Sequence, residues 1–370
     1  MNLKVAVLTP EPNINHLPYY NALCNSFIDS EITFFTYQEV ADSLTDNKVK
    51  FEVRKKNQSS LSYLFRIIKL LQKQDKIIID EPFGGTFFIF LLSLLCINKN
   101  MILTIHNINK WFSPKHLFHP KYIFYLLIRK IIKNNSSAFI VISPNLKKYI
   151  LKSSFTNKQV YFIPFSLPTK LDNIYTKSDD IYRICINGSV DLIRRDYMTV
   201  IRALESILKL GNTKIELFLL GRANINNSEV LNLIEKCDSI NKIYGKKIYY
   251  WTSYVSTYEY EKIMQNTDSF LLNINVFYQR ITGIEIYGIT KETGIIFSAL
   301  NYQKNLICVY DYTPPYELSN KIEKYVGTDD LVKILNGLKK DNDSMMKKNS
   351  MDAFNKTYRE DINQLKSNIN

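Results

Sequence analysis

Short apolar runs alternate with longer amphipathic stretches along most of the chain, which predicts a parallel β-sheet with helices on its faces. Six apolar runs in the first half predict strands: Leu3–Thr9, Glu31–Thr36, Lys76–Asp80, Met101–Ile105, Ala138–Ile142 and Gln159–Ile163. Between two of them, apolar residues recur at helical spacing, at Leu61, Leu64, Phe65, Ile68 and Leu71. The first half therefore predicts one doubly wound α/β domain.

The pattern breaks between Pro164 and Asp180, where Pro, Ser, Lys and Asp accumulate, and then starts again. Four further apolar runs predict strands: Ile181–Asn187, Lys214–Leu220, Ser269–Asn275 and Leu306–Tyr310. A stripe that ends at Gly211 predicts a helix, and its members are Tyr197, Val200, Ile201, Leu204, Ile207 and Leu208. Ser256 and Glu259 form a capping box, which predicts a second helix ending near Asn266.

A chain of 370 residues is long enough for two domains, each with its own core. We expect one doubly wound domain over residues 1–168 and a second doubly wound domain over residues 169–345. Residues 346–370 are polar, with weak helical spacing at Met351, Phe354 and Tyr358. This tail is expected to be a helix that packs back on the N-terminal domain, or a frayed end.

The charge balance changes which partners we expect. Lysine and arginine number 48 against 35 acidic residues, giving a formal net charge of +13. This excess favours an anionic partner, and nucleotide diphosphates, anionic lipids and nucleic acids all qualify. Heavy use of Lys and Asn can also follow from genome composition. With 46% apolar and 13% aromatic residues, disorder over most of the chain is excluded.

The cysteines and the first residues bear on location. Five cysteines are scattered without C-x-x-C or metal-like spacing, at Cys24, Cys96, Cys185, Cys237 and Cys308. An odd number inside apolar segments predicts buried thiols in a reducing compartment. The start, Met1 to Thr9, is a strand and too short for a signal peptide. The apolar stretch Thr86 to Ile97 is shorter than the roughly 20 residues that span a bilayer. We therefore expect a cytoplasmic protein.

The segment from Ile289 to Ile307 carries the most specific signal. A polar turn containing Thr293 and Gly294 opens a short helix, and an apolar strand follows. Free backbone N–H groups at such a helix start, together with the helix dipole, bind phosphate. Because ligands bind beyond the carboxyl ends of parallel strands, loops that follow strands are the places to inspect.

One such loop opens the second half with Gly188 and Ser189, followed by Arg194 and Arg195. A glycine lets the backbone approach a ligand closely, and two arginines before a helix can clamp a diphosphate. The alternative is a solvated basic turn. Arg222, after the next strand, adds a cation or is a surface residue. The backbone near Val255 is a candidate for binding a nucleotide base.

Three residues of the first half are candidates for proton transfer. His106 follows a strand and is expected to bond a sugar hydroxyl or phosphate, or to shuttle a proton. His16, in the loop after the first strand, and Glu81, which closes the third, are candidate bases. Each could instead serve only the structure. His116 and His119 lie in a Pro-containing loop and are expected to be exposed.

Several enzyme classes are disfavoured. The chain has no G-x-G-x-x-G and no Walker A run, which argues against dinucleotide oxidoreductases and P-loop NTPases. Its single D-x-D, Asp341 to Asp343, lies in a polar stretch just before residues 346–370 rather than at a strand end. A transferase built on a carboxylate-bound cation is therefore disfavoured, and we expect no metal and no cofactor.

A further stretch is both basic and apolar. Residues Lys121 to Lys133 combine large apolar side chains with basic ones, and Lys147, Lys148 and Lys152 follow. Such a patch could rest on an anionic membrane surface. A helix that covers the sheet with snorkelling lysines explains the same pattern.

Taken in order along the chain, these motifs resemble those of GT-B glycosyltransferases, in particular the family-4-like group of bacterial surface polysaccharide biosynthesis. Residues Thr104 to Asn107 resemble its cleft-histidine motif, and Ile142 to Asn145 its strand-to-helix junction. Arg195 lies near its basic donor residue, and the segment around Thr293 and Gly294, ending at Lys304, resembles its nucleotide-sugar segment.

The resemblance is incomplete where that group carries paired glutamates. Thr290 and Ser298 occupy the corresponding positions when Lys304 is aligned with the family lysine, and Glu292 is a displaced candidate. The usual glycine pair of the first loop is also absent. The stereochemistry of transfer therefore stays open.

The resemblance implies two Rossmann-like doubly wound domains facing a central cleft. It implies a metal-independent, hexosyltransferase-type enzyme that moves a sugar from a nucleotide-diphosphate sugar to a glycan, expected to be lipid-linked, in lipopolysaccharide, O-antigen or capsule synthesis. Two alternatives are a nucleotide-sugar epimerase of the same fold and a non-catalytic binder of anionic polymer. Basic–aromatic stripes typical of nucleic-acid readers are not evident, so no nucleic-acid partner is expected.

Overall fold

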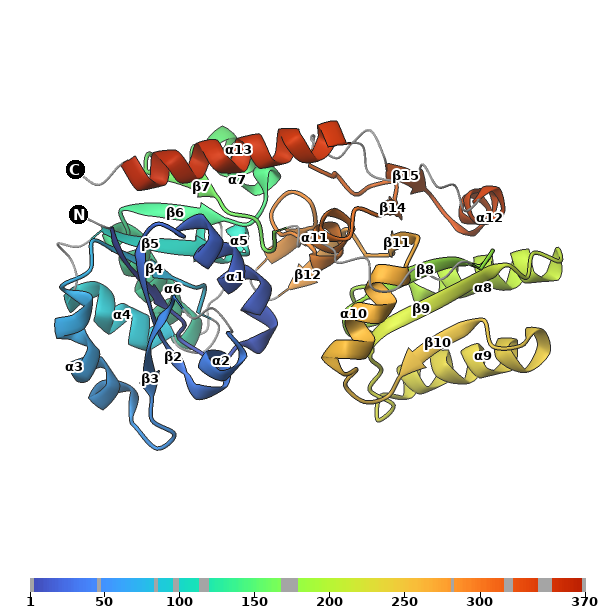
Figure 1. The fold of residues 1–370 in the computed structure, drawn as a ribbon, viewed down its shortest axis with the longest axis horizontal. Helices are drawn as coiled ribbons and strands as arrows, with labels where there is room; N and C mark the ends of the chain where they lie inside the picture. The colour runs from blue at the N-terminus through green and yellow to red at the C-terminus, as the bar shows by residue number, and fades with distance from the viewer. Residues whose placement is uncertain are drawn as a thin grey trace. The chain divides into compact units, whose positions relative to one another are not determined.

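The computed structural model describes residues 3–44, 48–82, 86–95, 100–112, 120–167, 179–280, 283–315, 322–338 and 348–367. The chain divides into two compact units (Figure 1). The first unit comprises Met1–Leu167, Gln279–Glu292 and Asn355–Asn370, and the second comprises Pro168–Tyr278 and Thr293–Phe354. The change of unit near residue 168 lies where the sequence pattern breaks, but the return of Gln279–Glu292 to the first unit was not expected.

The first unit contains a seven-stranded parallel sheet in the order β3-β2-β1-β4-β5-β6-β7. Its strands are β1 (Lys4–Leu8), β2 (Glu31–Tyr37), β3 (Lys50–Arg54), β4 (Lys76–Ile79), β5 (Asn100–Ile105), β6 (Ala138–Val141) and β7 (Gln159–Phe162). The inner strands are buried on both faces, which is why their sequences are continuous apolar runs. The order along the chain reverses between β1 and β4, where open α/β sheets bind ligands.

Helices cover both faces of this sheet. They are α1 (Leu17–Ser26), preceded by the 3-10 turn η1 (Ile14–His16), α2 (Gln38–Ser43), α3 (Ser60–Leu71), α4 (Thr86–Leu95), α5 (Ile108–Phe112), α6 (Pro120–Asn135) and α7 (Pro144–Lys152). Ser59 caps α3 by accepting the N–H of Ser62, and Ser143 caps α7. Among the described residues, none of the helices is both long and apolar enough to cross a bilayer.

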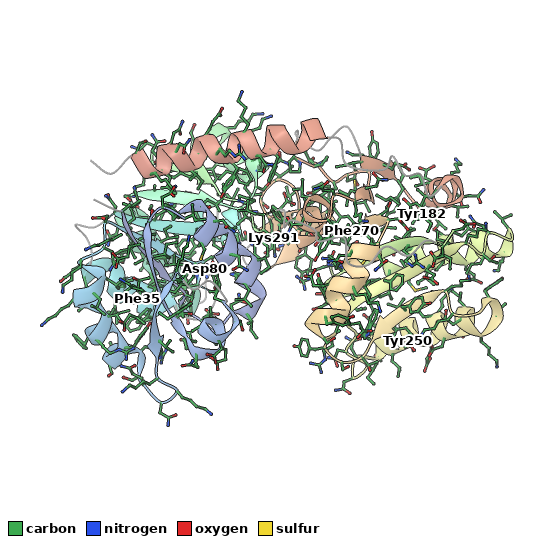
Figure 2. The ribbon with its side chains drawn as sticks, viewed as in Figure 1. Phe35, Asp80, Tyr182, Tyr250, Phe270 and Lys291 are labelled. Carbon is green, nitrogen blue, oxygen red and sulfur yellow. The ribbon has the colours of Figure 1, made fainter. Side chains whose placement is uncertain are left out.

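The second unit contains a six-stranded parallel sheet in the order β10-β9-β8-β11-β14-β15. Its strands are β8 (Tyr182–Asn187), β9 (Ile215–Arg222), β10 (Ile248–Trp251), β11 (Ser269–Leu272), β14 (Asn305–Val309) and β15 (Ile322–Tyr325). A separate two-stranded sheet pairs β12 (Phe277–Arg280) with β13 (Gly283–Ile286). The strand order again reverses, here between β8 and β11. Figure 2 shows Asp80 among the side chains of the first unit and Phe270 among those of the second.

The second unit has three helices at predicted positions, those starting at Tyr197, Thr257 and Gly294, and two that the sequence analysis did not predict, Ser228–Tyr244 and Thr328–Gly337. In chain order, these helices are α8 (Tyr197–Lys209), α9 (Ser228–Tyr244), α10 (Thr257–Asn266), α11 (Gly294–Asn301) and α12 (Thr328–Gly337). The stripe from Tyr197 to Leu208 is buried as predicted. Ser256 caps α10 by accepting the N–H of Glu259, while the Glu259 carboxylate accepts from the Trp251 indole at 3.2 Å. Only half of the predicted capping box is therefore formed.

The tail forms helix α13 (Lys348–Ser367), whose residues from Asn355 onward belong to the first unit. Tyr358 shares a hydrogen bond of 2.6 Å with Ser26, and Asp361 accepts from the backbone N–H of Phe162 at 2.7 Å. Asp361 also forms an ion pair with Lys147. The helix is thus held by polar contacts as well as by its buried Phe354. Cys96, His116, His119 and the Asp341–Asp343 motif lie outside the described residues.

Candidate active site

Three functional side chains of the first unit come together where its strand order reverses. His16 ends η1 after β1, Asp80 follows β4, and His106 follows β5. Parallel strands deliver their carboxyl ends to one edge of the sheet, so residues far apart in sequence become neighbours there. We call His16, Asp80 and His106 the His–Asp–His cluster.

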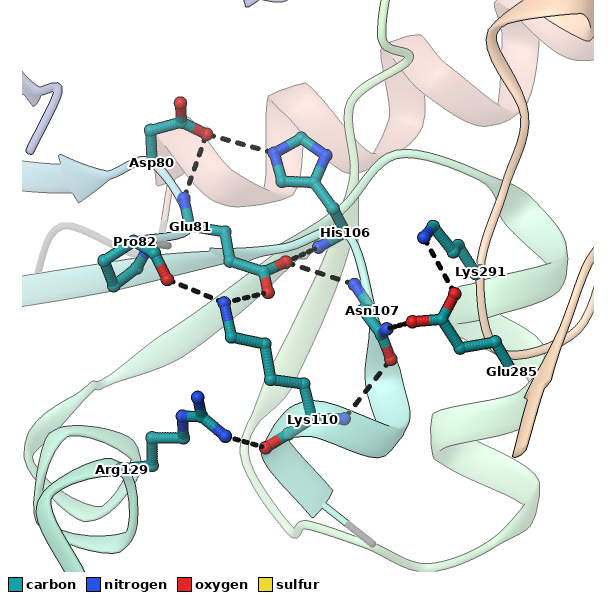
Figure 3. Close-up of polar contacts among 9 residues, drawn as sticks. All are labelled: Asp80, Glu81, Pro82, His106, Asn107, Lys110, Arg129, Glu285 and Lys291. Atoms are coloured by element: carbon teal, nitrogen blue, oxygen red, sulfur yellow. Dashed lines mark hydrogen bonds and ion pairs between the residues drawn. The ribbon is translucent and has the colours of Figure 1, made fainter. Parts of the chain in front are cut away.

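The Asp80 carboxylate is fully engaged. At Oδ2, His16 Nδ1 lies 2.7 Å away and the Tyr20 hydroxyl donates at 2.8 Å. At Oδ1, His106 Nε2 lies 3.0 Å away, and the backbone N–H of Glu81 donates at 2.9 Å (Figure 3). The centroids of the two imidazoles are 4.7 Å apart. A buried carboxylate thus holds both rings in fixed orientations.

The same contacts set the charges. Burial alone would raise the pKa of Asp80, but the charge of His16 and the hydrogen bonds from His106 and His16 place it far below its usual range. Burial lowers the pKa of His16, whereas the charge and hydrogen bond of Asp80 raise it. The net pKa of His16 lies above its ordinary value. Asp80 therefore stays ionised and makes His16 a stronger base than an isolated imidazole.

This arrangement suits proton transfer. In each ring, one nitrogen faces Asp80, so the second nitrogen is the atom that can exchange a proton with a ligand. The ligand atoms of His16, Asp80 and His106 also lie within 4.8 Å of one another, a spacing that could hold a metal ion. The short hydrogen bonds within the cluster account for the same spacing without one.

Glu81 is buried beside this cluster but engaged elsewhere (Figure 3). Its Oε2 accepts the backbone N–H groups of His106 and Asn107, and its Oε1 lies 3.0 Å from the Lys110 ammonium. Burial raises the pKa of Glu81, but the charges of Lys110 and His106 and the hydrogen bonds from these two residues together outweigh burial, and the net pKa is lowered. An ionised carboxylate that already accepts two hydrogen bonds and pairs with an ammonium is a weak proton acceptor. This geometry therefore favours a role for Glu81 in positioning the His106 loop over a role as base.

A segment from the second half of the sequence is attached to the same loop. The Asn107 amide donates to Glu285 at 2.6 Å, and Lys291 lies 2.8 Å from the other carboxylate oxygen of Glu285 (Figure 3). The backbone N–H of Ile108 donates to Thr290 O at 2.9 Å. No sequence pattern indicates this attachment, because Glu285, in β13, and Lys291, in the turn that follows, are ordinary charged residues.

In the second unit, Gly188 and Arg195 form the candidate phosphate site. Gly188 has φ of +99°, a conformation that side chains other than hydrogen rarely allow. Arg195 Nη2 donates to Asn187 O at 2.9 Å and lies so close that a Cβ on Gly188 would meet it at 2.9 Å. A Cβ on Gly221 would meet Gly188 O at 2.2 Å. Two glycines thus allow this loop and the guanidinium to pack together.

The two arginines differ in their partners. Arg194 forms an ion pair with Asp191, with Nε and Oδ2 2.6 Å apart. Arg195 is partly buried, and no carboxylate within the described ranges lies at ion-pair distance from it. An anion is the natural partner of such a guanidinium. The geometry therefore favours one arginine rather than the expected pair for a diphosphate, since Asp191 already neutralises Arg194.

The remaining donor candidates of the second unit lie on its surface. Ser189 and Arg222 are exposed, and the Arg222 guanidinium lies 5.4 Å from the centre of the Tyr254 ring. Val255 is half-buried. Nothing in their contacts assigns these three a ligand.

The helix predicted to start at Thr293 and Gly294 is present as α11. Thr293 is its N-cap but makes no side-chain capping bond, and Gly294 is exposed with no atom within 4 Å of an added Cβ. Ser298, one turn later, accepts from the Asn187 amide at 2.8 Å. The end of β8 and the first turn of α11 are therefore adjacent. Glu292, just before this helix, is buried.

Two asparagines that the sequence analysis missed lie at these strand ends. Asn187 ends β8, and its Oδ1 is buried without a hydrogen-bond partner among the described residues. Asn273 follows β11 and is fully buried, and its amide likewise has no partner in the described part of the chain. Its backbone oxygen accepts from Asp196 N at 2.7 Å, next to Arg195. Buried polar groups are normally paired, so these atoms call for a ligand or water.

The fold can be compared with known structures. It is similar to Anabaena HepE in complex with UDP-glucose, with a TM-score of 0.64, 10% identity, and coverage of 98% of this chain and 100% of that chain. A UDP-forming α,α-trehalose-phosphate synthase from Burkholderia xenovorans matches with a TM-score of 0.60 and 8% identity, over 100% and 99%. A Listeria monocytogenes protein assigned as a UDP-N-acetylglucosamine 2-epimerase matches with a TM-score of 0.58 and 11% identity, over 100% and 96%.

Sequence comparison adds no closer relative, since no protein-family model matches and no curated protein matches by sequence. The structural similarities extend over whole chains at very low identity, and therefore establish the fold alone. The presence of one parallel sheet in each half of the chain agrees with these similarities. The chain has the GT-B fold, built from two Rossmann-like doubly wound domains.

Proposed function

We propose that this protein is a glycosyltransferase that takes a sugar from a nucleotide-diphosphate donor. The observation that carries the proposal is Arg195, a partly buried guanidinium beside Gly188 without an acidic partner among the described residues. The start of α11, where Gly294 is exposed, would supply backbone N–H groups close to the same strand end. Cations and helix N-termini at one strand edge are what a diphosphate requires.

The second unit would bind the donor and the first unit the acceptor. In the reaction, the acceptor hydroxyl attacks the anomeric carbon while the bond from that carbon to the diphosphate oxygen breaks. The proton of the hydroxyl passes to His16, and the nucleoside diphosphate leaves with its charge stabilised by Arg195 and the α11 amides. His106 would orient the acceptor or donor, and Asp80 would hold both imidazoles. Glu292 stays a candidate for contact with the donor sugar.

The finer features of the proposal are a hexosyltransferase-type reaction without a metal ion and an acceptor glycan on a lipid carrier. A role in lipopolysaccharide, O-antigen or capsule synthesis at the inner face of the cytoplasmic membrane would follow. The resemblance of the sequence motifs supports these features. Metal independence predicts that EDTA leaves turnover unchanged. A loss of turnover in EDTA that is reversed by added Mg²⁺ or Mn²⁺ would contradict metal independence.

The test is a thermal-shift screen against a panel of sugar nucleotides, followed by product analysis with the best donor. The proposal expects one nucleoside diphosphate series to raise the melting temperature, and a glycoside to form only when an acceptor is added. An epimerase, the second function that one of the similar folds suggests, would convert the donor alone. If no sugar nucleotide raises the melting temperature, both the glycosyltransferase and the epimerase proposals are rejected.

A further inference from the structure

The outer surface of three helices in the first unit is unusually apolar. Eight large apolar residues on α3, α4 and α6 expose between 45% and 69% of their surface: Leu61, Phe65, Phe87, Leu94, Leu95, Ile123, Phe124 and Leu127. Single exposed apolar side chains are normal, but clusters of this size mark an interaction surface. None of these residues takes part in the candidate active site.

The three helices form one continuous layer. They connect strands that succeed one another in the same direction across the sheet, from β3 to β4, β4 to β5 and β5 to β6. Right-handed crossovers in one direction place their helices on the same face of the sheet. α4 packs against both α3 and α6, so it forms the centre of this layer (Figure 1). We call the outer surface of α3, α4 and α6 the apolar–basic face.

The charges on this face have one sign. α3, α4 and α6 contain no aspartate or glutamate at all. Arg66, Lys69 and Lys130 are exposed beside the apolar residues. By contrast, α9 of the second unit, which exposes Leu231 and Ile243, carries Glu229, Glu235 and Asp238 among its 17 residues. Apolar exposure without any acidic residue therefore distinguishes α3, α4 and α6 from α9.

We propose that the apolar–basic face binds the surface of an anionic phospholipid bilayer. Its apolar side chains would enter the boundary between headgroups and acyl chains, while Arg66, Lys69 and Lys130 pair with phosphates. The expected patch around Lys121 to Lys133 is thereby extended to α3 and α4. Lys147 contributes less, because it is already paired with Asp361. The inference rests on the proposed function and extends it, because binding to the bilayer would bring the enzyme to a lipid-linked acceptor.

The test is flotation of the full-length protein with vesicles of phosphatidylcholine, with and without phosphatidylglycerol. Wild type is expected to float only with phosphatidylglycerol, and less as salt rises. Phe65→Ser with Phe87→Ser should weaken partitioning by at least about tenfold. Lys69→Gln with Lys130→Gln should weaken it by about fivefold per lysine. The matched control, Ile243→Ser with Lys242→Gln, alters exposed residues of α9 and should bind as wild type does.

Three results would overturn the inference. Wild type could stay in the buffer with both vesicle types, or the α9 control could lose as much binding as the variants of the face. In the third, the wild type is a dimer, and Phe65→Ser with Phe87→Ser converts it to a monomer without changing flotation. This result would mean that the apolar–basic face binds a second copy of the chain. Donor binding is measured separately without vesicles. Intact donor binding with failed flotation rejects this surface and leaves the proposed function standing.

Discussion

The candidate sites of the two units differ in how their charged and amide side chains are paired. In the first unit, the carboxylates of Asp80 and Glu81 are surrounded by donors from within the protein. In the second, Arg195 has no acidic partner among the described residues, and the side-chain amides of Asn187 and Asn273 have buried atoms without partners there. A saturated network fixes its groups for chemistry, whereas unmet polar groups need a ligand. This contrast motivates our proposal that the first unit transfers the proton and the second binds the anion.

The largest effect is expected at His16. His16→Gln keeps a hydrogen-bonding side chain near Asp80 but removes the base. We expect kcat to fall by about 10²- to 10⁴-fold with donor affinity unchanged. Steady-state kinetics with isothermal titration of the donor measures both. A variant that keeps its kcat would show that His16 is a structural residue.

A loss of stability is expected when the saturated network is broken at Glu81. Glu81→Gln leaves the Lys110 ammonium, whose side chain is 11% exposed, without its counter-ion. The free energy of unfolding should fall by about 3 kcal/mol, measured by urea denaturation. Glu235→Gln, at an exposed position of α9, is the matched control and should change little. A comparably small loss in Glu81→Gln would mean that this pair is as weak as a surface ion pair.

Asn273 is expected to show the opposite behaviour. Because its amide has no described partner, Asn273→Leu should leave the stability of the donor-free protein unchanged or higher. Donor affinity should fall by about tenfold, since one hydrogen bond in the site is lost. Thermal melts with and without donor test both. If Asn273→Leu without donor loses several kcal/mol of unfolding free energy, about the cost of breaking a buried polar network, the Asn273 amide is hydrogen-bonded within the protein.

The smallest effect is a change of pH dependence. His16 must be neutral to accept a proton, so the rate rises with pH through its pKa, which Asp80 holds above the ordinary value. Asp80→Asn removes that charge, and the pKa of His16 falls. The acidic limb of the profile of kcat/KM against pH should move down by about one unit. If the acidic limb of the Asp80→Asn profile does not move, that limb reports the titration of a group other than His16.

Much of the fold was predictable because buried parallel strands and amphipathic helices leave strong patterns. The central strands were predicted within one to three residues at each end, as with Lys76–Asp80 for β4. The edge strands β3, β10 and β15 were missed. β3 and β15 mix apolar with charged residues, and all three are mostly half-exposed or exposed. The edge strand β7, which is mostly buried, was predicted.

The site was predictable only in part. His16, His106 and Arg195 stood out because they follow strands, but the bond of His16 to Asp80 joins residues 64 apart, and only the strand order brings them together. Asn187 and Asn273 look like ordinary turn residues. What singles them out is buried atoms without partners, which no sequence pattern reveals.

The central claim is that the second unit binds a diphosphate through Arg195. Isothermal titration of the preferred sugar nucleotide with Arg195→Ala, and with Arg202→Ala as the matched exposed control on α8, tests it most directly. The account predicts that Arg195→Ala weakens donor binding by about 10²-fold with an unchanged melting temperature, while Arg202→Ala binds as wild type does. Equal donor affinity in wild type and Arg195→Ala would contradict it.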